Sequence, residues 1–215
     1  MNRTVVFIYA MTNDSGFAPC VQKNWFTLAC CKGGVRGGMR KSAAKEFLAG
    51  NNVYLLGLCG KTLDREKANL PVYLAKIDEV IEMEEYYADS GRSKGRADDV
   101  YKVINGELIS KANNPHKTHY LHEKDKGGQY VLCSHQFTYW GNKCGESGHE
   151  IEQELNEIFK NIRSRQSFRG HMACRVLNGF EDAVMTWDWL PQQSDRCNII
   201  SKRSIKGELV SGGKC

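Results

Sequence analysis

A carboxylate, a glycine-rich turn and four cations lie close together near the start of the chain. The acid is Asp14, and the cations are Lys32, Arg36, Arg40 and Lys41. Glycine lets the backbone approach a ligand closely, and arginine presents a planar fork of donors that matches phosphate. We therefore expect these cations to bind phosphate. We expect Asp14 to act as a catalytic carboxylate, which activates water or stabilises a developing cation. The alternative is a solvated loop in which Asp14 forms an ordinary turn.

A second pair of acids, Asp98-Asp99, follows Arg96. Neighbouring side chains on a strand point to opposite faces, so only one of the two acids can face a site. We take Asp98 as the second catalytic candidate. The alternative is a solvated turn before a hairpin.

The segment 116–122 carries three histidines at a spacing of three residues, with Asp125 close behind. Such a set binds a metal only if the segment is helical or specially folded. Pro115 and the twin glycines at 127–128 favour a loop instead. We therefore expect neither a metal nor a cofactor, and we assign His116 to a phosphate.

Alternate aromatic residues mark the segment 135–141. On a strand, His135, Phe137 and Tyr139 share one face. Such a face can stack on a nucleobase, at about 1–3 kcal/mol per base. The alternative is a stripe of side chains that faces the core.

The elements that must position these residues are short apolar strands with few helices. We predict strands at 5–10, 26–31, 52–59, 71–78 and 129–134, a hairpin turn at 105–106, a short acidic helix or turn at 79–87, and helices at 40–49 and 150–162. Residues 110–128 have no clear period. This pattern indicates an α+β fold around a mixed or barrel-like sheet with a few flanking helices. We expect one domain over residues 1–190 and a polar, basic tail over 191–215.

Composition limits the class of protein. Apolar residues make up 41% of the chain and charged residues 26%, which is typical of a globular domain. The formal net charge is +5, and residues 1–50 hold seven cations against two acids. No segment has the roughly 20 apolar residues of a membrane span, and no signal peptide is evident, so we expect a cytoplasmic protein. The nine cysteines include no Cys-x-x-Cys pair, and Cys30, Cys59 and Cys133 are typical of core residues.

Four motifs, in order, carry a resemblance to a known family. They are Asp14-Ser-Gly-Phe-Ala-Pro19, Thr27-Leu-Ala-Cys-Cys-Lys32, Arg96-Ala-Asp-Asp-Val-Tyr101 and Ser134-His-Gln-Phe-Thr-Tyr-Trp-Gly141. Over residues 5 to about 190 the chain resembles the nucleotide-modification-associated domain family, type two. The likeness implies a protein that acts around modified bases in DNA, often in phage or mobile elements. We also expect Phe17 and Tyr101 to bind the base beside His135, Phe137 and Tyr139.

The chain departs from that family pattern at three points. Lys32 is followed by glycine rather than proline, Cys20-Val21 stands where the family has Asn-Pro, and Trp140 replaces phenylalanine. A fainter resemblance, in residues 51–57 and 73–89, is to base-reading barrels of the PUA and EVE type. Such barrels hold a flipped base in an aromatic pocket, which is the same ligand that the first likeness implies.

Together these features favour a DNA-acting protein that recognises a flipped, modified nucleobase. The most concrete version is a DNA glycosylase, a hydrolase of the N-glycosidic bond, in which Asp14 or Asp98 stabilises the oxocarbenium-like sugar. A role in defence against phage with altered bases fits the family's genomic company. The alternatives are a non-catalytic reader of modified bases and an enzyme that installs or trims a base modification. The modified base, the preferred strandedness, protein partners and the oligomeric state are not indicated.

Overall fold

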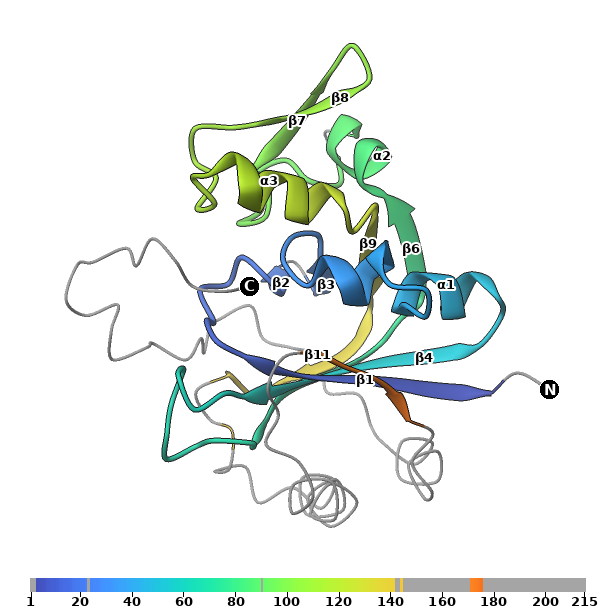
Figure 1. The fold of residues 1–215 in the computed structure, drawn as a ribbon, viewed down its shortest axis with the longest axis vertical. Coiled ribbons are helices and arrows are strands. Elements are labelled where there is room, and N and C mark those ends of the chain that lie inside the picture. Colours follow the sequence, from blue (N-terminus) through green and yellow to red (C-terminus); the bar gives the residue numbers. More distant parts are fainter. Residues whose placement is uncertain (1–2, 23, 90, 142–143, 145–170, 176–215) are drawn as a thin grey trace.

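The computed structural model describes residues 3–22, 24–89, 91–141, 144 and 171–175 (Figure 1). Its strands are β1 (Thr4–Met11), β2 (Cys20–Gln22), β3 (Trp25–Leu28), β4 (Asn52–Cys59), β5 (Pro71–Lys76), β6 (Glu79–Glu82), β7 (Tyr101–Ile104), β8 (Glu107–Ser110), β9 (Tyr130–Ser134), β10 (Gln136–Tyr139) and β11 (His171–Arg175). Its helices are η1 (Gly34–Gly38), a single π-helical turn, and the α-helices α1 (Ala43–Leu48), α2 (Met83–Ala88) and α3 (His119–Lys126). The α+β prediction is confirmed.

The larger sheet has five strands in the order β10-β5-β4-β1-β11. Its centre is built from the two longest apolar runs, β1 and β4, which pair in parallel in an unbroken register from Thr4–Asn52 to Met11–Cys59. Strands buried on both faces read as continuous apolar runs, so these two were predictable. A parallel pair needs a crossover, and the crossover between β1 and β4 contains β2, β3, η1 and α1.

A second sheet has four strands in the order β2-β3-β9-β6. Strands β6 and β9 lead away from the larger sheet toward the end of the molecule where α2, α3 and the β7–β8 hairpin lie (Figure 1). The hairpin turns at Asn105 and Gly106, whose φ angles of 53° and 80° are those of the tight turn that the sequence predicts. Among the described residues the sheets do not close into a barrel, which corrects the barrel-like alternative.

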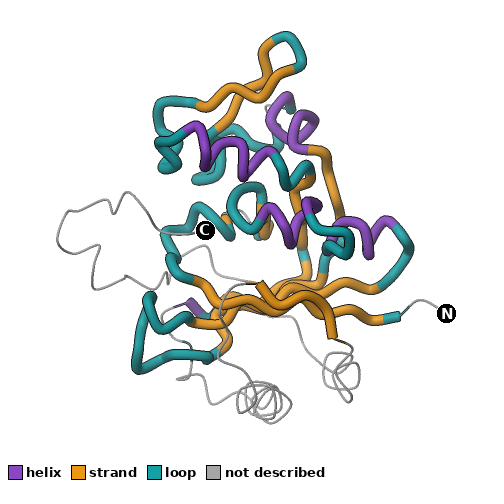
Figure 2. The backbone as a smooth tube through the Cα atoms, viewed as in Figure 1, coloured by secondary structure: helices purple, strands orange, loops and turns teal. Residues whose placement is uncertain are grey.

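Helices are few and short in the described part of the chain (Figure 2). The predicted helix at 40–49 is α1, which begins after Ser42, whose side chain accepts from the Lys45 backbone N–H. The acidic segment 79–87 is strand β6 followed by helix α2, rather than helix or turn alone. Segment 110–128, whose sequence has no clear period, contains α3.

The core lies mainly around the larger sheet, with a second apolar cluster between β3, β9, α2 and the hairpin. Cys30, Cys59 and Cys133 are fully buried in these clusters, as predicted. In the described part of the chain no helix combines the length and apolar character needed to cross a membrane. The helix predicted at 150–162 and the tail at 191–215 lie outside the described residues.

Candidate functional site: a thiol, an imidazole and a carboxylate

Cys31 lies in the connection between β3 and η1, in an unusual backbone conformation. Its φ is 55° and that of Lys32 is 46°, both in the left-handed region that side-chain-bearing residues seldom adopt. Such strain costs on the order of 1–3 kcal/mol per residue and concentrates at functional sites. The Cys31 backbone N–H donates to Asp125 Oδ1 over 2.7 Å, which holds this turn in place.

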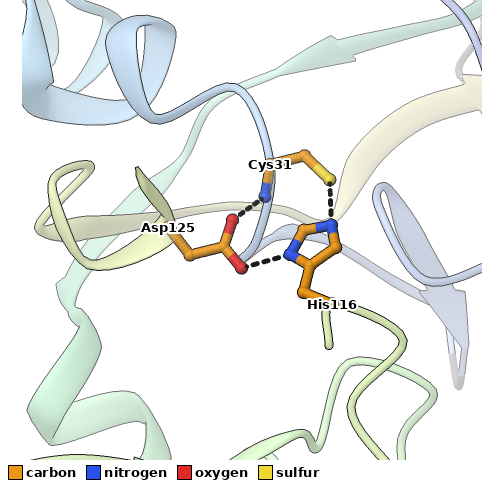
Figure 3. Close-up of side chains that lie close together, drawn as sticks. All are labelled: Cys31, His116 and Asp125. Carbon is orange, nitrogen blue, oxygen red and sulfur yellow. Dashed lines mark hydrogen bonds and ion pairs between the residues drawn. The ribbon is translucent and has the colours of Figure 1, made fainter. Parts of the chain in front are cut away.

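The imidazole of His116 lies between Cys31 and Asp125, with the thiol at one ring nitrogen and the carboxylate at the other (Figure 3). Cys31 Sγ is 3.5 Å from His116 Nε2, and His116 Nδ1 is 2.6 Å from Asp125 Oδ2. His116 and Asp125 are buried, while Cys31 is half-buried. These three side chains are called the thiol triad below.

Two aromatic residues border the thiol triad. The Tyr101 hydroxyl donates to Asp125 Oδ2 over 3.0 Å, so the carboxylate accepts from both Tyr101 and the imidazole. Burial raises the pKa of the Tyr101 phenol far above its usual range, and the Asp125 charge adds to the effect, so the phenol stays a donor. The Phe17 ring meets His116 edge-on at a centroid distance of 5.3 Å.

Close backbone packing brings these distant segments together. A Cβ on Gly33 would come within 2.5 Å of the Lys124 carbonyl oxygen, and one on Gly37 would overlap the Gly128 carbonyl. The glycines that follow the Cys31 turn therefore let η1 lie directly against the end of α3, which carries Asp125. This glycine-rich stretch, expected from the sequence to let a ligand approach, makes room for backbone instead.

Arg36 strengthens that junction from inside. Its guanidinium is fully buried and donates to three carbonyl oxygens, those of Cys31, Tyr130 and Asp125. The cations expected to bind phosphate therefore differ in their exposure to solvent. Arg40 and Lys41 are exposed.

Lys32 lies between the triad and the end of β1. Its ammonium donates to the Ala10 carbonyl over 3.3 Å and sits 4.8 Å from the centre of the Tyr9 ring. Burial raises the pKa of the Tyr9 phenol far above its usual range, and both Cys31 and Asp14 add to this increase. Cys31 and Asp14 therefore both act electrostatically on Tyr9.

Asp14 is buried, and the Tyr139 hydroxyl donates to its Oδ2 over 2.6 Å. The structure therefore brings together one expected catalytic acid and one expected base-binding ring. Asp98 belongs to a separate network, in which its carboxylate accepts from Thr27 over 2.6 Å and from Tyr86 over 3.0 Å and pairs with buried Arg96. Burial raises the pKa of the Asp98 carboxyl, and Arg96 is the main opposing influence.

The other expected base-binding residues do not share one face. His135 is largely exposed and stacks on Trp25, and its Nδ1 lies 3.5 Å from Asp78 Oδ2. Phe137 is buried in the core against Phe26, in keeping with the alternative of a core-facing stripe.

The three histidines at 116, 119 and 122 do not converge either. His119 is exposed, and the His122 ring nitrogen bonds the His116 carbonyl over 2.7 Å. Only His116 joins the thiol triad. Sequence reasoning identified His116 but assigned it to phosphate, and it did not single out Cys31, because nothing in the local pattern distinguishes it from its buried neighbour Cys30.

Comparison with protein families gives a match over most of the chain. The family model described as nucleotide modification associated domain 2 matches residues 3–194, which include the whole site. No curated protein and no solved structure matches the chain.

Proposed function

Since the chain belongs to the nucleotide modification associated domain 2 family, we propose that it is an enzyme that trims a modification from a nucleobase, with Cys31 as its nucleophile. The observation that carries this proposal is the spacing of the thiol triad, 3.5 Å from sulfur to imidazole and 2.6 Å from imidazole to carboxylate. A nucleophile, a base and a group that orients the base are the signature of covalent catalysis.

The hydrogen bonds support a role for each member in this proposal. The Asp125 carboxylate can only accept, so Nδ1 of His116 carries the proton and Nε2 turns its lone pair to the Cys31 thiol. His116 then removes the thiol proton, and Asp125 holds the ring in that tautomer and stabilises the imidazolium that forms. Tyr101 fixes the carboxylate in turn.

The chemistry suits a substituent joined to the base through a carbonyl, as an amide or an ester. The Cys31 thiolate attacks the carbonyl carbon, and the base nitrogen or oxygen leaves with the proton held on His116 Nε2. Water then attacks the thioester and gives its proton to His116, which releases a carboxylic acid and restores the thiol. With a base amine in place of water, the same steps install the group from an acyl donor.

A nucleotide substrate fits the surroundings of the triad. Exposed Arg40 and Lys41 follow η1 in the chain and offer charge for phosphate. The Phe17 ring, buried and edge-on to His116, gives the site an apolar aromatic wall. Modified DNA, including that of phage, is the substrate we propose to test first.

A second candidate function rests on a different contact. Asp14 is buried and accepts the Tyr139 hydroxyl over 2.6 Å, which pairs a carboxylate with an aromatic ring as a glycosylase requires. In this version Asp14 stabilises the oxocarbenium-like sugar while the whole base departs. The two versions differ in their products, because trimming leaves the base on the sugar and glycosylase action leaves an abasic site.

The test is incubation with a panel of phage DNAs that carry acylated, glucosylated or otherwise altered bases. Nucleosides are analysed by mass spectrometry, and abasic sites are scored separately. We expect loss of the substituent with retention of the base, abolished by Cys31→Ala and kept by Asp14→Asn. His119→Gln, at an exposed histidine near the site, is the matched control and should remain active.

Other outcomes overturn this assignment. Abasic sites that depend on Asp14 but not on Cys31 would establish the glycosylase version. Tight, base-selective binding with no product across the panel would show a reader and remove both enzymes. Intact-mass analysis during turnover adds an independent check, since trimming requires an adduct on Cys31.

A further inference from the structure

Two soft metal ligands meet in the thiol triad. Thiolate sulfur and imidazole nitrogen are the ligands that Zn²⁺ prefers in proteins. We propose that Cys31 Sγ and His116 Nε2 form a reversible Zn²⁺ site, which withdraws the nucleophile and switches the thiol off. Binding replaces the thiol proton by the metal and releases that proton to solvent.

The distance between the two atoms matches the ligand separation in a tetrahedral zinc site. With Zn–S near 2.3 Å and Zn–N near 2.05 Å, a tetrahedral angle separates sulfur from nitrogen by about 3.6 Å. Sγ and Nε2 are 3.5 Å apart. The donor atoms of Cys31, His116 and Asp125 all lie within 4.8 Å of one another, so the carboxylate lies close to both proposed ligands.

Asp125 supports such a site from behind the imidazole. A metal-bound histidine usually donates its other ring N–H to a carboxylate, which fixes the ring and strengthens the ligand. His116 Nδ1 meets Asp125 Oδ2 in this way, and Asp125 Oδ1 accepts the backbone N–H of Cys31. One carboxylate therefore orients both ligands, and Tyr101 in turn holds the carboxylate.

The number of ligands indicates how the site would behave. Catalytic zinc sites commonly have three protein ligands and structural sites have four. Here Asp125 is engaged on the far side of the ring, which leaves two protein ligands, and water completes the shell. We therefore expect a weaker site that loads and unloads, rather than a resident structural metal.

The neighbouring candidates are poor ligands for the same ion. Cys30 is fully buried, its sulfur lies 3.2 Å from the Tyr87 hydroxyl, and burial raises its pKa well above the usual range. A thiol that resists ionisation binds metal poorly. His119 is exposed, and His122 is bonded to the His116 carbonyl. The regular histidine spacing in the sequence is thus not the source of this site.

The experiment uses the full chain and Co²⁺ as a spectroscopic substitute for Zn²⁺. A cobalt–thiolate bond gives a sulfur-to-metal charge-transfer band in the near ultraviolet. We expect the band in the wild type and in His119→Gln, its loss in Cys31→Ser, and displacement of the metal by Zn²⁺ but not by Mg²⁺. Asp125→Asn should weaken binding by about 10- to 100-fold.

A second measurement covers the case in which a variant folds poorly. In the wild type, Zn²⁺ should slow the alkylation of Cys31 by iodoacetamide by about tenfold or more, as read from peptide masses, and a chelator should restore the rate. Unchanged alkylation, or a cobalt band that persists in Cys31→Ser, would overturn the proposal. Neither readout depends on turnover, so the metal site can fail while the trimming reaction stands, and the reverse.

Discussion

Two buried carboxylates, Asp98 and Asp125, are surrounded by nearly the same kinds of residue. The Asp98 cluster contains a tyrosine, a cation and a cysteine, namely Tyr86, Arg96 and Cys20. The Asp125 cluster contains Tyr101, His116 and Cys31. Each tyrosine donates to its carboxylate over 3.0 Å. The clusters differ in the nitrogen group beside the carboxylate, which is a permanently charged guanidinium in one and an imidazole in the other.

That difference separates a structural cluster from one whose side chains can transfer a proton. Arg96 also donates to the carbonyls of Cys20, Gln22 and Trp25, so its guanidinium cross-links part of the second sheet. This group does not lose its proton in a folded protein. An arginine cannot accept a proton from a thiol, whereas a neutral imidazole can. Burial of a carboxylate therefore does not by itself indicate a functional site. The residue that is paired with the carboxylate must also be known.

The two cysteines differ in the same sense. Cys20 is fully buried, and burial together with the Asp98 charge raises its pKa to about 12, which keeps it a thiol. Cys31 is half-buried and faces a ring nitrogen that can take its proton. We therefore expect substitutions in the Asp125 cluster to change the rate of reaction, and substitutions in the Asp98 cluster to change the free energy of unfolding.

The largest expected effect is that of Asp125→Asn on the rate. The amide can donate to Nδ1 and so stabilise the wrong tautomer, with the ring proton turned toward the thiol. We expect Cys31-dependent product to form about 10²- to 10⁴-fold more slowly, with a far smaller change in the urea midpoint. A rate within about threefold of the wild type would show that Asp125 does not orient the base.

Asp98→Asn should have the opposite profile. Removing the charge leaves Arg96 buried and unbalanced, and breaking such a pair costs about 3–5 kcal/mol of unfolding free energy. Urea denaturation measures this loss. The matched control is Asp99→Asn at the next residue, whose partner Lys111 is partly exposed and whose substitution should cost less than about 1 kcal/mol. Equal losses in the two variants would contradict the structural role of Asp98.

A smaller effect is expected from alkaline pH, again through the Asp98 cluster. The Cys20 thiol ionises near its ordinary pKa of about 8.5 in the unfolded chain but only at about 12 in the folded protein. Between these values the unfolded state binds fewer protons, so stability falls as pH rises, by about 1.4 kcal/mol per pH unit from this thiol. Denaturation at pH 8.5 and 10 measures the slope.

Cys20→Ala is the comparison for that slope. The variant should be less stable at pH 8.5 because it loses buried sulfur, but its stability should fall less steeply toward pH 10. Buried Cys30 and Cys133, whose pKa values burial also raises, keep part of the slope in both proteins. Identical slopes in the variant and the wild type would show that folding does not raise the pKa of Cys20.

Much of the fold was predictable because its signals are local. The apolar runs of β1 and β4 and the Asn105-Gly106 turn each determine their own conformation. Helix α3 was not predicted because its sequence is polar nearly all round, and Asp125 is its one buried residue. Two local signals were present, the Thr118 side chain that accepts from the Leu121 N–H and Gly127 directly after the helix.

The site was less predictable because its members are far apart in the chain. Cys31 is 85 residues from His116 and 94 from Asp125, and tertiary packing alone joins them. The strained φ of Cys31 and the contact of the glycine stretch with the end of α3 have no counterpart in local propensity. Sequence reasoning found acids and cations by type, but it could not tell Asp98, paired with arginine, from Asp125, paired with histidine.

The smallest expected effect comes from Tyr101→Phe, which removes one hydroxyl from the Asp125 cluster. The lost bond to Asp125 Oδ2 should cost about 1 kcal/mol, or roughly five- to tenfold in rate if it acts through the carboxylate. With one donor fewer, Asp125 holds the imidazolium more strongly, so the pH–rate profile should also move to higher pH. Tyr86→Phe removes the equivalent donor to Asp98 and should lower stability by a similar amount without moving the profile. A profile that moves equally in both variants, or in neither, would mean that the two clusters do not differ in the way that their arginine and histidine indicate.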